Sequence, residues 1–137
     1  NEGIADRIAT FETESRSVDV VRAWFERPHP IVVVEENAVI AFAAAQPSST
    51  RACYSRNAEF SVYVERASPG RGAGRCAMLA LIEALPDWNK LVSHVFAENS
   101  ASLGMLRSVG FREVGKLERH GSIDGRWRDV IVVERLL

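Results

Sequence analysis

The stretch 59–85 holds the residues whose types and spacing are best suited to chemistry. Glycine recurs at every second position, at Gly70, Gly72 and Gly74, after an apolar run and before a helical pattern. Glycine has no Cβ, so a ligand can approach the main chain closely at these positions. The N-terminus of a helix adds N–H donors and the positive end of the helix dipole. We therefore expect an anion, most plausibly a phosphate group, to bind at this loop.

Other interpretations of these glycines compete with a phosphate site. They could belong to a loose strand-to-helix turn, although a single glycine would suffice for one. The run 72–77, GAGRCA, also satisfies the dinucleotide fingerprint GxGxxG/A, and Glu98 follows at about the spacing of a ribose ligand. That fingerprint normally opens a parallel βαβ sheet, whereas three antiparallel-looking strands come first here. A kinase-like phosphate loop is disfavoured because no Gly-Lys-Ser/Thr follows.

The run 62–79, VYVERASPGRGAGRCAML, resembles the acetyl-CoA pyrophosphate loop of the GNAT superfamily of N-acetyltransferases. The usual pattern of that loop is Arg/Gln-x-x-Gly-x-Gly/Ala; Gly72 and Gly74 match it, and Pro69 stands at the Arg/Gln position. Further segments are similar to the phosphinothricin-type acetyltransferases in the same order, namely GIADRIATFETE, AEFSVYV, NSASL with GFREVG, and RHGSIDGRWRDVIVVERLL. The resemblance thus covers nearly the whole chain.

The resemblance implies acetyl-CoA as co-substrate and a set of residues that bind it. Backbone N–H groups of residues 70–75 would hold the pyrophosphate, with two arginines adding charge, and the strand 62–64 would bind the pantetheine arm and polarise the thioester carbonyl. Asn99 and Ser102 resemble an N-x-x-S element that contacts pantetheine, although both suit helix capping equally well. The expected cofactor-binding residues are Val62, Tyr63, Val64, Gly70, Arg71, Gly72, Ala73, Gly74, Arg75, Asn99 and Ser102.

Glu59 stands where the resembled family has its general base. An amine is protonated at neutral pH and must lose a proton before it can attack a thioester, and a carboxylate can accept that proton. The alternative interpretation is a solvent-exposed glutamate at the end of a strand. Leu106 occupies the position at which the family tends to have a His or Tyr, so the CoA thiol would leave as thiolate or be protonated by water or another residue.

Three residues are candidates for binding the amine substrate. Arg51 matches a family position that contacts the anionic end of the substrate, and a forked guanidinium suits a phosphinate, arsonate or carboxylate. Phe11 and Tyr54 could form walls of the same pocket. A surface loop arginine and two core aromatics would explain the same residues without a substrate.

The predicted function is acetyl-CoA-dependent acetylation of the α-amine of a small amino acid analogue with an acidic side group. The resemblance implies phosphinothricin-like, arsinothricin-like or methionine sulfoximine-like substrates and a homodimer. Two alternatives stay open. One is a catalytically weak CoA-binding module, and the other is an acetyltransferase that acts on protein or peptide amines.

Composition and charge limit the class of protein. The 137 residues are 47% apolar and 26% charged, which predicts one domain over 1–137 with a single core. The net charge of −1 provides no field that would attract nucleic acid. No apolar stretch approaches the roughly 18 residues needed to span a bilayer, so we expect no membrane partner.

The cysteines and histidines predict neither a disulfide framework nor a metal site. Cys53 and Cys76 lack CxxC spacing and follow no signal-peptide pattern, which favours a reducing cytoplasm. His29, His94 and His120 have no partner at metal-ligand spacing. His94 lies in an apolar strand pattern and fits a core or edge histidine better than a ligand.

The elements expected around the glycine loop follow the order α-β-β-β-α-β-α-β-β. The first helix would be capped by Ser17, end before Pro28 and carry Val18, Val21 and Phe25 at helical spacing on one face. The later elements are expected at 31–34, 39–45, 60–64, 76–85, 91–96, 100–109, 111–119 and 127–136.

The fold class is expected to be α/β (α+β), with a GNAT-like, mixed and mostly antiparallel sheet that is flanked by helices and splayed beside the glycine loop. In the resembled family, a first strand and much of a first helix precede the position of Asn1. We therefore expect an N-terminally truncated domain that lacks the first strand.

Overall fold

The computed structural model describes residues 1–67, 70 and 72–137. Its helices and strands follow the predicted order, with a short helix and a 3-10 turn added. In chain order they are α1 (Glu2–Asp6), α2 (Val18–Phe25), β1 (Ile31–Glu36), β2 (Ala38–Pro47), η1 (Ala52–Tyr54), β3 (Asn57–Val64), α3 (Ala73–Glu83), β4 (Lys90–Phe96), α4 (Ser100–Ser108), β5 (Arg112–Ile123) and β6 (Arg126–Leu136).

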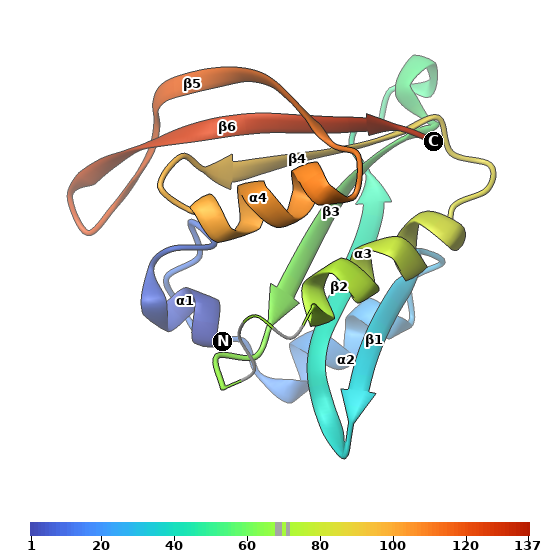
Figure 1. The fold of residues 1–137 in the computed structure, drawn as a ribbon, viewed down its shortest axis with the longest axis horizontal. Helices are drawn as coiled ribbons and strands as arrows, with labels where there is room; N and C mark the ends of the chain where they lie inside the picture. The colour runs from blue at the N-terminus through green and yellow to red at the C-terminus, as the bar shows by residue number, and fades with distance from the viewer. Residues whose placement is uncertain (68–69, 71) are drawn as a thin grey trace.

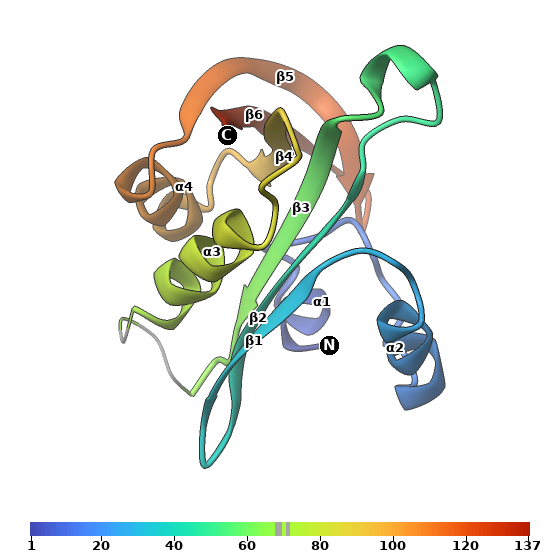
Figure 2. The same ribbon diagram turned by 90° about the vertical axis from the view of Figure 1, so that its right-hand side faces the viewer.

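The strands form one six-stranded sheet in the order β1-β2-β3-β4-β6-β5. Neighbouring strands are antiparallel except for the central pair, β3 and β4, which are parallel. Helices α3 and α4 cover one face of the sheet, and α1 and α2 lie on the other (Figures 1 and 2). The predicted mixed, mostly antiparallel sheet flanked by helices is therefore confirmed.

Turn residues fix the two hairpins where the sequence places them. Asn37 joins β1 to β2 with φ of 61°, and Asp124 and Gly125 join β5 to β6 with φ of 49° and 74°. Two successive positive φ values match the right-handed twist of paired strands, and Asp-Gly adopts them at low cost. The predicted Asp-Gly turn is confirmed.

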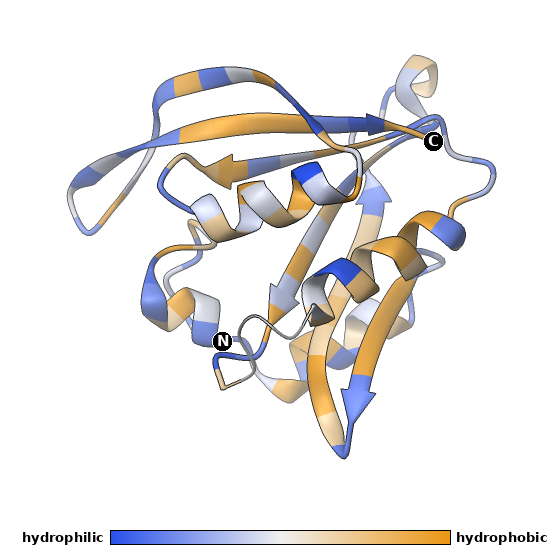
Figure 3. Cartoon of the chain, in the orientation of Figure 1, coloured by the Kyte–Doolittle hydropathy of each residue, from blue (hydrophilic) through white to orange (hydrophobic). Residues whose placement is uncertain are grey.

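The main core lies between α3 and the sheet. Met78 and Leu81 of α3 are fully buried, and β2 presents small side chains to this face, at Ala41, Ala43 and Ala45. Small side chains on the strand let the helix pack close to the sheet. The apolar colouring of β1, β2 and α3 in Figure 3 follows this contact. The core thus anchors α3, and with it the glycine-rich entry of that helix.

The face that α2 packs on the sheet is not the one that carries Val18 and Phe25. The helix begins as expected, because Ser17 Oγ accepts a hydrogen bond of 3.4 Å from the Val20 N–H. Val18 and Phe25 are 72% and 61% exposed, so these two apolar side chains are not part of the core. The helix instead directs Trp24 toward Phe42 of β2, with ring centroids 6.4 Å apart. Helical spacing alone could not distinguish these two neighbouring faces.

Candidate active site

The central strands β3 and β4 separate partway along their length. Their ladder joins only 57–59 to 90–92 in the described chain, and Ser93 Oγ then donates a hydrogen bond of 2.9 Å to the Phe60 carbonyl. Beyond this point the strands diverge (Figure 1). The Phe60 carbonyl points toward β4, and main-chain directions alternate along a strand. Val62 and Val64 therefore direct their N–H and carbonyl groups into the gap, as expected for a pantetheine-binding strand.

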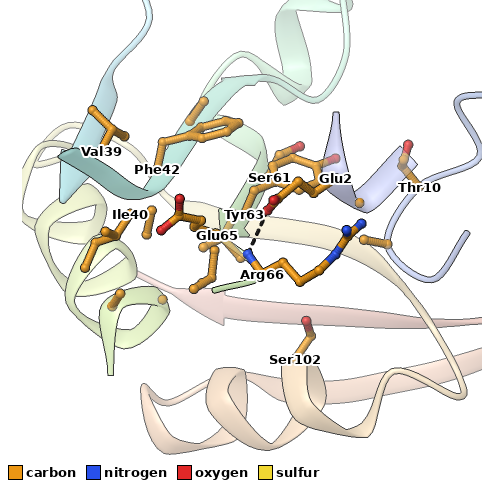
Figure 4. A pocket seen from close by; sticks show the side chains of 18 of the residues that line it. Glu2, Thr10, Val39, Ile40, Phe42, Ser61, Tyr63, Glu65, Arg66 and Ser102 are labelled. Atoms are coloured by element: carbon orange, nitrogen blue, oxygen red, sulfur yellow. Dashed lines mark hydrogen bonds between the residues drawn. The ribbon is translucent and has the colours of Figure 1, made fainter. Parts of the chain in front are cut away.

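A cleft of about 1340 Å³ lies at this divergence. Side chains from α1, β2, β3 and α4 line it, as Figure 4 shows for residues such as Tyr63 and Ser102. The predicted cofactor residues that line it are Val62, Tyr63, Val64, Gly70, Gly72, Ala73, Gly74, Arg75, Asn99 and Ser102. Arg71, the remaining one, lies outside the described residues, as does Pro69. The fold thus brings together residues from three separate segments that the sequence analysis grouped.

The N-terminus of α3 opens onto this cleft. Gly72 is its N-cap with φ of 76°, and no side chain caps this end. The first helical hydrogen bond runs from the Cys76 N–H to the Gly72 carbonyl, at 2.9 Å. The N–H groups of 73–75 precede it, and helices leave such groups without an intrahelical acceptor. These donors fit an anionic ligand such as a diphosphate.

Gly74 sits where a side chain would close the cleft. A Cβ at this position would lie 3.0 Å from Val64 Cγ2 and 3.6 Å from Met105 Cε. Gly72 and Gly70 have positive φ values, which disfavour any other residue. The close contact with Val64 therefore explains why position 74 is a glycine, and the positive φ explains the glycines at positions 70 and 72.

Arg66 connects the loop after β3 to helix α1. Its backbone N–H donates to Glu2 Oε2 at 2.7 Å, drawn in Figure 4, and its guanidinium contacts both Asp6 oxygens at 3.1 and 2.6 Å. All three residues line the cleft. The sequence gives no local signal for these contacts, because Arg66 and its partners in α1 are about 60 positions apart.

Helix α4 supplies the opposite wall of the cleft. Asn99 Oδ1 accepts a hydrogen bond of 3.1 Å from the Ser102 N–H, so Asn99 caps the helix as the alternative interpretation expected. Its Nδ2 donates to the Ile8 carbonyl at 3.3 Å and connects α4 to the segment after α1. Leu106 is buried in the core and presents no polar group. Among the described residues, α4 presents two hydroxyl groups to the cleft, those of Ser102 and Ser108, and that of Ser108 donates to the Met105 carbonyl at 2.6 Å.

Tyr63 adds a phenol to the cleft. Burial raises the pKa of this phenol, a hydrogen bond with Thr10 opposes that rise, and nearby Arg16 and Glu12 act more weakly. The Tyr63 ring also packs on Phe42, with centroids 5.2 Å apart. The raised pKa keeps the hydroxyl protonated, so Tyr63 can donate a hydrogen bond. From the sequence, only the main chain of Tyr63 is expected to bind the cofactor. Side chains alternate between the two faces along β3, and this alternation could have indicated that the Tyr63 side chain shares the face of Ser61.

Glu59 lies at the margin of the cleft, outside its lining. Its ladder partner Gln46 and the next residue on its face, Ser61, both line the cleft. The side chain is 42% exposed, and its Oε1 lies 3.7 Å from His94 Nδ1 on β4. Val62 follows Glu59 by three positions, which is about 10 Å along a strand. The carboxylate is therefore accessible to solvent.

The predicted substrate residues lie in two places. Phe11 packs edge-on against Phe96, with centroids 4.7 Å apart, near the end of β4. Arg51 and Tyr54 contact each other, with the guanidinium carbon 5.4 Å from the ring centroid. Both are exposed in the loop before β3 and do not line the cleft. The structure therefore does not bring Arg51 and Tyr54 together with the glycine loop.

Three further observations bear on chemistry and environment. Among the described residues, no three or more His, Cys, Asp and Glu side chains gather in a way that could hold a metal ion. In the same part of the chain, every helix is too short or too polar to cross a membrane. Cys53 and Cys76 are exposed and unbridged.

Comparisons with known proteins agree with this geometry. The model of the acetyltransferase (GNAT) family matches residues 4–111. The chain is 28% identical over 147 residues to a phosphinothricin N-acetyltransferase of Streptomyces coelicolor, covering 100% of this chain and 86% of the relative.

Two solved structures are similar over the full chain. A phosphinothricin acetyltransferase from Sinorhizobium meliloti in complex with acetyl-CoA has a TM-score of 0.90 and 25% identity, covering 99% of this chain and 78% of that one. A ribosomal-protein-alanine N-acetyltransferase from Brucella melitensis has a TM-score of 0.94 and 28% identity, covering 100% and 89%. The chain belongs to the acetyltransferase (GNAT) family and is an N-acetyltransferase similar to the phosphinothricin-type members.

Proposed function

We propose that the chain acetylates the α-amine of a small amino acid analogue with an acidic side group, using acetyl-CoA. The observation that carries this proposal is the cleft in which the glycine-rich N-terminus of α3 and the diverging part of β3 face each other. Relatives named for phosphinothricin support the substrate class. Arsinothricin and methionine sulfoximine have a similar size and polarity and belong to the same proposal.

Acetyl-CoA would supply an activated acetyl thioester, and the chain's main-chain groups would hold it. The N–H groups of 73–75 would bind the diphosphate, with charge from Arg75. The N–H groups of Val62 and Val64 would bind the pantetheine arm, and one of them would stabilise negative charge developing on the thioester oxygen. Asn99 and Ser102 would line the arm from α4.

Glu59 is the proposed general base. A protonated amine in the cleft must lose a proton before attack, and Glu59 is a carboxylate on the sheet face that Ser61 and Gln46 share with the cleft. Its half-exposed position leaves room for a direct contact or for one intervening water molecule.

The departing thiolate is negatively charged and needs a hydrogen-bond donor. Leu106 cannot be that donor, because its side chain is apolar. Ser102 and Tyr63 both line the cleft and carry hydroxyl groups. The phenol of Tyr63 stays protonated because burial raises its pKa. We propose that these hydroxyls, together with water, solvate the thiolate as it leaves.

Phe11, Arg51 and Tyr54 remain proposed substrate residues, and the homodimer remains a proposed assembly. Phe11 reaches the face that bears Glu59, because its partner Phe96 follows His94 by two residues on β4. Arg51 would have to act from the loop before β3. Sedimentation velocity of the purified chain tests the assembly.

A thiol-release assay with a panel of amines tests the proposed function. We expect turnover with L-phosphinothricin and methionine sulfoximine, weak turnover with neutral amino acids, and none with N-acetylphosphinothricin. A peptide that begins with alanine tests protein acetylation. This alternative is suggested by the similar Brucella structure, which is named as a ribosomal-protein-alanine N-acetyltransferase. Faster turnover of that peptide would replace the proposed substrate class. Acetyl-CoA binding without thiol release from any amine would favour a binding module.

A further inference from the structure

We propose that His94 pairs with Glu59 and passes the amine proton from that carboxylate to solvent, a role that rests on the proposed function of Glu59. His94 Nδ1 lies 3.7 Å from Glu59 Oε1, within ion-pair distance. The two side chains come from neighbouring parallel strands. His94 is not among the described residues that line the cleft, and it is a positioning and relay residue.

The position of this pair follows from the way the central strands separate. Glu59 pairs with Val92 at the last rung of the β3–β4 ladder, so their side chains share a face. The next residue of β4 on that face is His94. The strands diverge at this level, so the imidazole meets the carboxylate at the mouth of the cleft instead of packing beside it in a closed sheet.

A bulge in β5 brings a second imidazole over the first. Leu117 pairs with Val130 and Gly121 with Arg128, so 118–120 lie opposite the single residue Asp129. Within the bulge, His120 stacks on His94 with centroids 5.8 Å apart and ring planes 2° from parallel.

Asp129 holds the bulge in shape. Its Oδ1 accepts a hydrogen bond of 2.9 Å from the Arg119 N–H, and Arg119 has the positive φ of 48°. Its Oδ2 lies 2.8 Å from Lys116 Nζ. A strained residue that is fixed by a charged partner indicates a defined bulge, and bulges commonly reorient side chains near functional sites.

Other charged residues near His94 pair with one another, whereas Glu59 lies within ion-pair distance of His94. Glu134 of β6 and Lys90 of β4 form an ion pair at 2.9 Å, and Arg112 of β5 also contacts Glu134. The residue opposite His94 on β6 is apolar, namely Val132. Among the described residues, His120 also contacts the ring. The Glu59 carboxylate is thus the acidic group that lies within ion-pair distance of the His94 ring in this part of the chain.

The relay moves one proton from the substrate amine to Glu59, then to His94 and finally to water. The amine N–H bond breaks as an O–H bond forms on Glu59, and the amine keeps its electron pair for attack. Because 3.7 Å is longer than a hydrogen bond, the proton then moves from Glu59 to Nδ1 of neutral His94 through one bridging water molecule. This step restores the carboxylate and forms an imidazolium. The imidazolium releases its Nε2 proton to water. Since the His94 side chain is 41% exposed, water can reach the ring.

The test combines chemical rescue with a double-mutant cycle. We expect His94→Ala to lower kcat about tenfold or more at pH 7, within the range of proton-transfer effects. Added imidazole should restore part of the rate of His94→Ala, and His94→Gln should be as slow as His94→Ala, because an amide cannot accept the proton. Glu59→Gln combined with His94→Ala should be no slower than Glu59→Gln alone, because both act on one proton.

Acetyl-CoA affinity, measured by calorimetry, separates a relay from a folding defect. His94→Ala should keep the dissociation constant within about twofold of wild type. Additive losses in the double variant, or the absence of imidazole rescue, would overturn the relay. If Glu59→Gln retains full turnover, Glu59 is not the general base. The relay then fails together with that part of the proposed function, and any loss of rate in His94→Ala must have another cause.

Discussion

Ser93 Oγ donates a hydrogen bond of 2.9 Å to the Phe60 carbonyl at the point where β3 and β4 part. The ladder proper ends one residue earlier, so this side chain takes over from the main chain as the connection between the strands. The bond therefore sets where the cleft begins.

We predict that Ser93→Ala lowers the free energy of unfolding by about 1 kcal/mol, because the half-buried Phe60 carbonyl loses its donor. Urea denaturation measures the change. Acetyl-CoA should also bind more weakly, since the origin of the cleft is less well fixed. Ser93→Thr keeps the hydroxyl and is the matched control. Equal stability of the Ala and Thr variants would show that the bond does not define the opening.

Glu59→Gln should lower kcat by about 100-fold or more while acetyl-CoA affinity stays within about twofold. Gln has the same shape but cannot accept the amine proton, and Glu59 does not line the cofactor cleft. Steady-state kinetics and calorimetry measure the two quantities. Glu83→Gln, an exposed change at the end of α3, is the control. Unchanged turnover in the Glu59 variant would remove this residue from the mechanism.

Local signals predicted much of the fold. Ser17 and Asn99 accept the capping hydrogen bonds expected from their positions, and Asp124 and Gly125 form the expected turn. Each of these features depends on interactions within a few residues, which a sequence displays directly.

Features that depend on distant packing were not predictable in the same way. Nothing near Arg66 in the sequence indicates that Asp6 is its partner. The stacking of His120 on His94 depends on a bulge in one strand and the divergence of another. The exposed side of Phe25 depends on how α2 lies across the sheet. The glycine loop was predictable because close approach of main chain requires a particular residue type.

Arg51 and Arg16 are two competing candidates for binding the acidic side group of the substrate. Arg51 is the family-based candidate, whereas Arg16 lines the cleft, with its guanidinium 2.8 Å from Glu12 and 5.4 Å over Trp24. If Arg51 binds the anionic group, Arg51→Ala should raise the KM for phosphinothricin about tenfold and leave that for methionine unchanged, while Arg51→Lys recovers little. The KM values of Arg16→Ala measured in parallel decide between the two arginines.

Acid should weaken the ion pairs that Glu134 of β6 forms with Lys90 of β4 and Arg112 of β5. The hydrogen bond from Lys90, and that from Arg112, lower the pKa of this carboxyl below its ordinary 4.5, while burial opposes the shift. A lowered pKa in the folded state gives stability that is present above about pH 4.5 and is lost as the pH falls through the folded value. We predict that Glu134→Gln is less stable than wild type at pH 7 and that the gap narrows by pH 3.5. Denaturant titrations at both pH values measure it; a gap that widens in acid would contradict the assignment.

Calorimetric titration of acetyl-CoA tests the central claim that the glycine-rich entry of α3 and the diverging edge of β3 form the cofactor site. The wild type should bind one molecule per chain, and the double variant Gly72→Ala, Gly74→Ala should lose at least about tenfold in affinity, because one alanine is strained at positive φ and the other meets Val64. Gly104→Ala is the control, since its Cβ would meet nothing within 4 Å. No heat from the wild type, or the same heat from the double variant, would contradict the account.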